Sequence, residues 1–236
     1  MGAIEYLIFH PEKENDEILA ALTTEENSLQ RRQFIVAVTQ NVLKKVQVLD
    51  SMWSTADASQ RLWFTESPID ANSLSSPLNR LTNNMVDLLN MTYKYKVGHP
   101  LGYFARLGMM NVVDPQPNRV ESWGSGYSIE VLTSTLRGLS IVFNGGDQLG
   151  YDDYLESLNA QVEYEDGTLA EVINNTIETS IAQLDALGEP LEDAVLNNPD
   201  DVDAIYQELR NLNRLIVVDM ANNLGITLYF NDTDGD

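Results

Sequence analysis

The chain opens with the run MGAIEYLIF, residues Met1–Phe9, an apolar stretch compatible with a helix that contains one carboxylate, Glu5. Burial of this run would take the charge of Glu5 out of water, which is costly unless a partner compensates it. A buried Glu5 would therefore need a partner. The alternative is a glutamate that faces solvent or interacts with the dipole at the start of its helix.

Apolar residues recur at intervals of three and four in the rest of the chain, which is typical of helices in a bundle. The longest stripe runs from Ile35 to Trp53, and the capping-box pattern of Thr23 and Glu26 predicts the start of its helix. Later helices are predicted from Pro77 to Gly98, from Ser128 to Asn144, from near Asp152, from Gly167 to Gly188 and from Pro199 to Gly225. Only Ile226–Phe230 is predicted to be extended. The sequence therefore predicts an all-α protein of up-and-down helical bundles.

Two segments are predicted to connect the helices: residues 54–76 form a loop, and residues 98–119 form a connection with at most one short helix. Residues 54–76 are rich in Ser, Asp and Asn, and residues 98–119 contain several Gly and Pro residues. The second segment is the best internal boundary. We expect a helical segment over residues 1–112 that completes a first bundle, and a C-terminal helical bundle over residues 113–236.

The charge of the chain limits its partners. The net charge is −22, from 36 acidic and 14 basic residues, which argues against nucleic acid or an anionic membrane surface as a partner. Cations and basic surfaces are favoured instead, and the alternative is a highly soluble or salt-adapted surface. Without cysteine the chain cannot form disulfides or thiolate metal sites. No apolar run approaches the roughly 20 residues of a transmembrane helix, so no transmembrane segment is predicted.

Four stretches, taken in order, resemble the motifs of one protein family. They are Met1–Phe9, Lys96–Gly102 (KVGHPLG), Glu121–Ser128 (ESWGSGYS) and Leu224–Asp236 (LGITLYFNDTDGD). They are similar to the G-x-H-x-x-E, K-x-G-x-P-x-G, E-S-x-x-S-x-x-S and C-terminal segments of imelysin-like proteins, which form peptidase family M75. On this resemblance Glu5 takes the glutamate position of the first motif, and Gly2 stands where many members carry the histidine.

The resemblance implies two related helical bundles with a ligand-binding cleft between them. It also implies a helical N-terminal portion before the first motif as a partner of this chain, so that the first bundle is incomplete here. Members of the family are associated with iron uptake, and export to the periplasm or a lipid anchor at the bacterial cell surface is expected. The partner is then a metal ion or a small ligand, with iron or zinc as the possible cofactor.

The matched motifs supply the candidate site residues. We predict a ligand-binding site from Glu5, Lys96, His99, Glu121, Ser122 and Ser125, with Glu5 as a metal ligand. Lys96 is expected to pair with Glu5 or Glu121. For His99 the alternative is a turn histidine bound to backbone carbonyls. For Glu121 and the serines, the alternative is capping of the helix that follows.

Other residues that could carry chemistry are less well supported. His10 lies beside Glu12, Glu14 and Asp16, which together could bind iron or zinc, although a loop histidine is the commoner case. Neither histidine belongs to an H-E-x-x-H zinc motif, and no Ser-His-Asp arrangement can be assigned, so we predict no catalytic residue. The acidic tail Asp232–Asp236 does not fit the spacing of an EF-hand and is predicted to be structural.

Two main functions are consistent with these observations. The first is an exported binding protein for a metal or small ligand, and the second is the metallopeptidase for which the family is named. Hydrolysis requires a ligated metal with an open position and a base, and Gly2 replaces the motif histidine. We therefore favour binding. A structural or partner-binding surface protein is a third possibility.

Overall fold

The computed structural model describes residues 2–10, 12–54, 58–68, 70, 73–106, 109–162 and 167–229. The chain forms two compact units, Met1–Pro68 and Ile69–Asp236. The boundary expected after residue 112 falls inside the second unit. The predicted acidic tail, Asp232–Asp236, lies outside the described residues.

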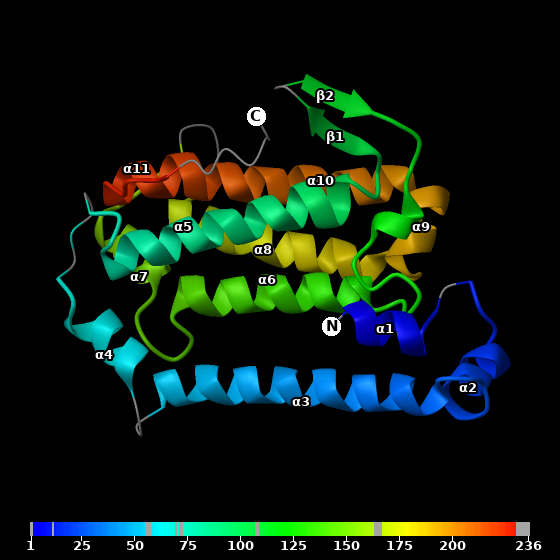
Figure 1. Ribbon diagram of the computed structural model, residues 1–236. Helices are drawn as coiled ribbons and strands as arrows, with labels where there is room; N and C mark the ends of the chain where they lie inside the picture. The colour runs from blue at the N-terminus through cyan, green and yellow to red at the C-terminus, as the bar shows by residue number, and fades with distance from the viewer. Residues whose placement is uncertain are drawn as a thin grey trace. The chain divides into compact units, whose positions relative to one another are not determined.

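The first unit is built along one long helix (Figure 1). Its helices are α1 (Gly2–Ile8), α2 (Asn15–Thr23), α3 (Ser28–Trp53) and α4 (Ser59–Glu66). Helix α3 contacts each of the other three. The predicted helices at the start of the chain and between Ile35 and Trp53 are therefore present.

Two local predictions for this unit are wrong. Thr23 and Glu26 do not start α3, because Thr23 is the last residue of α2 and its hydroxyl donates a hydrogen bond to the Leu19 carbonyl at 2.6 Å. Helix α3 starts instead after Asn27, whose φ of 65° turns the chain. The predicted loop of residues 54–76 contains α4, because its polar composition obscured the helix around Trp63.

The second unit is an up-and-down bundle of four helical rods. The rods are α5 (Pro77–Asn90) with its π-helical continuation η1 (Met91–Gly98), α6 (Ser128–Asn144), α8 (Leu169–Ala186), and α10 (Pro199–Arg214) with η3 (Leu215–Met220) and α11 (Ala221–Leu224). Successive rods run in opposite directions (Figure 1). Two short helices, α7 (Tyr151–Ser157) and α9 (Leu191–Asn197), and the 3-10 helix η2 (Pro117–Arg119) lie in the connections. The all-α bundle prediction is confirmed.

The core of this unit is formed by the predicted apolar stripes. Its fully buried side chains include Leu89, Leu132, Leu136, Phe143, Ile173, Leu184, Val202, Leu209 and Ile216. Predicted helix ends are also present: Ser76 caps α5 by accepting a hydrogen bond from the Asn79 backbone N–H, and Gly145 ends α6 with a φ of 70°. Burial of these stripes is the main source of stability of the bundle.

The segment predicted as a boundary forms a β-hairpin. Strands β1 (Tyr103–Arg106) and β2 (Met109–Val112) pair antiparallel. The Tyr103 hydroxyl donates a hydrogen bond to the carboxylate of Asp203 on α10 at 3.0 Å, and its ring packs at 5.1 Å against Tyr206. These contacts attach the hairpin to the bundle, which explains why the boundary after residue 112 does not separate compact units.

The segment predicted to be extended, after Gly225, is held by a buried side chain of α5. The Asn83 amide donates to the Thr227 carbonyl at 3.1 Å, and its oxygen accepts from the Tyr229 backbone N–H at 2.9 Å. Residues 226–229 are therefore fixed to the bundle by a side chain and belong to no assigned strand.

Candidate functional site

The predicted site residues of the second unit are positioned first by the π-helix η1. A π-helix has a wider turn than an α-helix and is often found at functional sites. Here it carries Lys96 and ends at Gly98, where a Cβ atom would lie 2.9 Å from the Tyr206 ring and 3.0 Å from the Tyr93 carbonyl oxygen. Glycine is therefore required at the end of η1, and His99 follows it directly.

The second part of the site is the loop between η2 and α6. Ser122 has a φ of 64°, and Gly124 and Gly126 also have positive φ values. The Ser122 carbonyl accepts hydrogen bonds from the backbone N–H groups of Ser125 and Gly126 at 3.2 Å, and from the Ser125 hydroxyl at 3.0 Å. The Ser128 hydroxyl donates to the Glu121 carbonyl. These serines shape the turn before α6, but the N-cap residue of that helix is Tyr127, whose side chain makes no cap hydrogen bond. The role of the serines in ligand binding stays a prediction.

Lys96 and Glu121 join these two parts. The Lys96 ammonium nitrogen lies 2.7 Å from a carboxylate oxygen of Glu121, and their side chains are 22% and 47% exposed. Glu121 is one of the two partners considered for Lys96. The ammonium carries three N–H donors, so this contact leaves capacity for a ligand. The two family motifs are therefore adjacent in space.

His99 follows Lys96 closely in the sequence, and its ring packs between two aromatic rings. Its ring centroid is 4.7 Å from that of Tyr95 and 4.6 Å from that of Phe104, and the Arg119 guanidinium lies 5.1 Å above the Phe104 ring. Burial lowers the pKa of His99, and the positive charge of Arg119 lowers it further. The imidazole is therefore neutral at pH 7.

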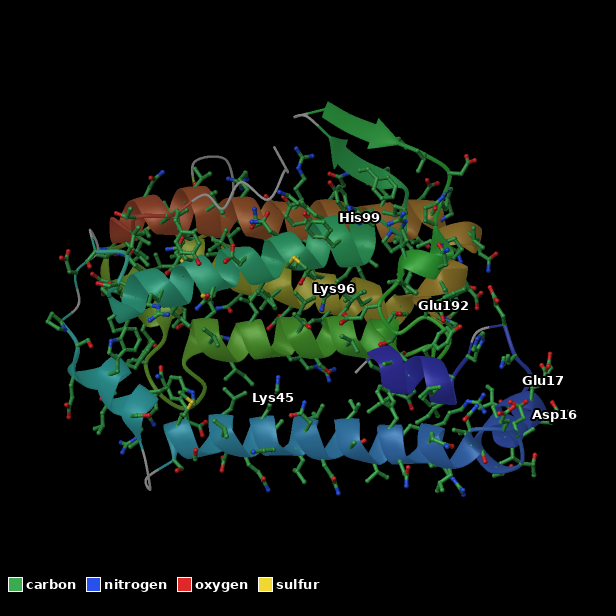
Figure 2. All side chains as sticks on the ribbon, viewed as in Figure 1. Asp16, Glu17, Lys45, Lys96, His99 and Glu192 are labelled. Atoms are coloured by element: carbon green, nitrogen blue, oxygen red, sulfur yellow. The ribbon has the colours of Figure 1, made fainter. Side chains whose placement is uncertain are left out.

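Figure 2 shows Lys96 and His99 at the end of the rod that α5 and η1 form. We call Lys96, His99, Arg119 and Glu121 the polar cluster. It combines a paired ammonium, a guanidinium, a neutral imidazole and a half-exposed carboxylate. Such a set can bind an anion through its cations and hydrogen-bond a polar group through the imidazole.

Glu5 belongs to the first unit, in α1, where it is half-buried. In the same unit His10 accepts a hydrogen bond at Nδ1 from the Glu12 backbone N–H at 3.2 Å, and its ring lies 4.4 Å from that of Tyr6. Among the described residues no three His, Asp or Glu side chains come together as a metal site. The assignment of Glu5 as a metal ligand therefore stays a prediction.

Sequence reasoning missed Arg119 and the rings of Tyr95 and Phe104. A basic residue two positions before Glu121, in a chain with few basic residues, was a signal for Arg119. The contact of His99 with Phe104 had no such signal, because it depends on how the chain folds between η1 and β1.

Comparison with models of protein families finds a match over most of the chain. The family model described as Imelysin, Peptidase_M75, matches residues 1–217. The chain belongs to the imelysin family. The imelysin match includes the segments that carry Glu5, Lys96 and Glu121, and it ends before the C-terminal motif. No curated protein and no solved structure matches the chain. Within the described parts of the chain, every helix is too short or too polar to cross a membrane.

Proposed function

We propose that this imelysin-family protein is an exported binding protein that takes part in the uptake of iron, another metal or a small ligand. Its ligand site is the polar cluster. The observation that carries the proposal is the Lys96–Glu121 ion pair, because it joins two family motifs that the β-hairpin separates in the sequence. The π-helix and the positive φ at Ser122 are further features often found at functional sites.

The charges of the polar cluster favour an anionic ligand. Lys96 and Arg119 are cations, and the lowered pKa of His99 keeps its imidazole free of charge at neutral pH. A bare metal ion fits poorly, because the described residues bring no three ligating side chains together there and the two cations would repel it. A metal held in a carboxylate chelate carries negative charge and avoids both difficulties. Iron uptake and a site for an anionic ligand are compatible on this basis.

Calorimetric titration tests the proposal with three probes: citrate, ferric citrate and zinc chloride. We expect citrate or ferric citrate to bind, and Lys96→Met to weaken that binding by about tenfold or more, since a charge-assisted hydrogen bond is lost. Lys94→Met is the matched control, because Lys94 lies on the same helix outside the ion pair. Glu5→Gln tests the predicted metal ligand, whose loss should weaken zinc binding. Failure of all three probes to bind would refute the proposal.

The family name keeps a metallopeptidase as the second candidate. Gly2 at the position of the motif histidine argues against it, because a hydrolytic metal needs its ligands, an open coordination position and a base. Incubation of the protein with an unstructured peptide, with zinc or ferrous iron added, should leave the peptide intact. Metal-dependent cleavage that Glu5→Gln abolishes would establish the peptidase instead.

A further inference from the structure

A cavity of about 550 Å³ lies between the first half of α6 and the end of α8. Its walls include Ile129, Thr133 and Arg137 from α6, Leu184 and Asp185 from α8, and Pro190 before α9. None of the residues of the polar cluster lines it. The cavity is therefore a separate place in the second unit, independent of the proposed function.

Thr133 points to a ligand in this cavity. It is 4% exposed, and its hydroxyl makes no hydrogen bond with any residue that the structure describes. Other helical threonines donate to a carbonyl of the preceding turn, such as Thr135 to Val131 and Thr176 to Val172, both at 2.8 Å. Buried hydroxyls nearly always have a partner. Since Thr133 lines the cavity, a polar group that enters the cavity would supply that partner.

The charged residues of the cavity lie on both of its helices. Arg137 and Glu130 lie on α6, and Asp185 lies on α8; none of the three forms an ion pair within the described residues. A fourth charged side chain, Glu189, already accepts hydrogen bonds from the side-chain amides of Asn197 and Asn198 at 2.8 and 2.6 Å. The cavity therefore offers one cation and carboxylates to a ligand.

We propose that this cavity binds a small zwitterion, an α-amino acid or a dipeptide with an apolar side chain. Arg137 receives the carboxylate of the ligand, Asp185 receives its ammonium group, and Thr133 makes the remaining hydrogen bond. Ile129 and Leu184 contact the apolar side chain.

Other ligand classes fit the lining less well. A phosphate would meet one arginine among several carboxylates, which repel it. A sugar usually stacks on an aromatic ring, and none of the described lining residues is aromatic. A metal ion needs converging ligands, and the described acidic residues form no group of three that could hold one.

Calorimetric titration of the whole chain tests the proposal with L-leucine and the dipeptide Leu–Leu. Leucine methyl ester lacks the carboxylate, and N-acetyl-leucine lacks the ammonium group. We expect Arg137→Gln to weaken leucine binding about tenfold or more and to leave the weak binding of the methyl ester unchanged. Asp185→Asn should weaken leucine binding similarly without affecting N-acetyl-leucine. Glu178→Gln is the control, because Glu178 is an exposed carboxylate of the same helix outside the cavity.

The outcomes separate the possible explanations. Leucine binding that both cavity variants weaken and the control preserves supports the proposal. Binding that neither variant changes places the ligand elsewhere and overturns it, as does equal affinity for leucine and its two blocked derivatives. Absence of saturable binding at millimolar leucine or Leu–Leu also overturns it. The polar cluster is tested separately, with citrate and Lys96→Met. Failure of the leucine titrations therefore does not refute the proposed function, and failure of the citrate titrations does not refute the amino-acid site.

Discussion

The Lys96–Glu121 ion pair gives a prediction whose size follows from its geometry. At 2.7 Å the Coulomb attraction of two unit charges in water is about 1.5 kcal/mol, and loss of side-chain freedom and screening by salt reduce it. Exposed pairs contribute about 0.2–1 kcal/mol, and the partial burial of Lys96, which is 22% exposed, favours the upper end of that range. We therefore expect a coupling free energy of about 1 kcal/mol.

A double-mutant cycle measures this coupling. Four proteins are unfolded in urea and followed by far-UV circular dichroism: the unchanged protein, Lys96→Met, Glu121→Gln and the double variant. The two single changes should together cost about 1 kcal/mol more than the double change, and the difference should fall at high salt. Lys96→Met combined with Glu178→Gln is the control, and its effects should add. Additive effects of Lys96→Met and Glu121→Gln, within about 0.3 kcal/mol, would refute the view that this pair joins the two motif segments.

Three further predictions concern the second unit. Tyr151→Phe removes the hydrogen bond at 3.0 Å to Thr82 and should lower the free energy of unfolding, measured in urea, by about 1–2 kcal/mol. In the unchanged protein, burial raises the pKa of Tyr151 to about 12, so the absorbance of its phenolate should be absent at pH 10. Asn83→Ala removes both contacts to the C-terminal segment and should speed hydrogen exchange of the Tyr229 amide, whereas unchanged protection would contradict the role of Asn83. The NMR titration of His99 should have its midpoint below the ordinary pKa of 6.5. On acidification the His99 imidazole is protonated in the unfolded state before it is protonated in the folded state. The stability that neutral His99 contributes is therefore present above pH 6.5 and is lost as the pH falls through its folded-state pKa. His99→Gln should remove that part of the pH dependence of stability.

The helices of the second unit could be predicted because they combine local signals with an apolar stripe. Helix α6 has the predicted bounds, from Ser128 to Asn144, since Gly145 ends it and its apolar residues keep a helical spacing. The change to π-helix at Met91 could not be predicted, because α- and π-helical turns give nearly the same apolar pattern over a few residues.

Residues 98–119 and helix α4 differ from what their local composition indicates, for related physical reasons. Residues 98–119 have the composition of a linker, but Tyr103 attaches them to Asp203, a contact between residues distant in the sequence. Such a contact outweighs local composition. Helix α4 was missed for a similar reason, because short helices in a polar context depend on their neighbours more than on propensity.

The candidate site could be predicted in part. The sequence left Glu5 and Glu121 as alternative partners of Lys96, and the structure brings Lys96 and Glu121 to 2.7 Å. The positions of Arg119 and Phe104 around His99 depend on tertiary packing, which the sequence pattern did not reveal. Likewise, the sequence places Thr133 on a helix but cannot tell whether its hydroxyl finds a partner.

The central claim, that the polar cluster is a ligand site, is tested most directly by NMR of the imidazole signals. The chain has two histidines, so His10 serves as an internal control for His99. The probe is gallium citrate, a diamagnetic substitute for ferric citrate, added stepwise at neutral pH. We predict saturable shifts of the His99 signals that Lys96→Met reduces, with His10 unchanged. Saturable binding that shifts the His10 signals alone, or no shift of either histidine over the whole titration, would contradict the account.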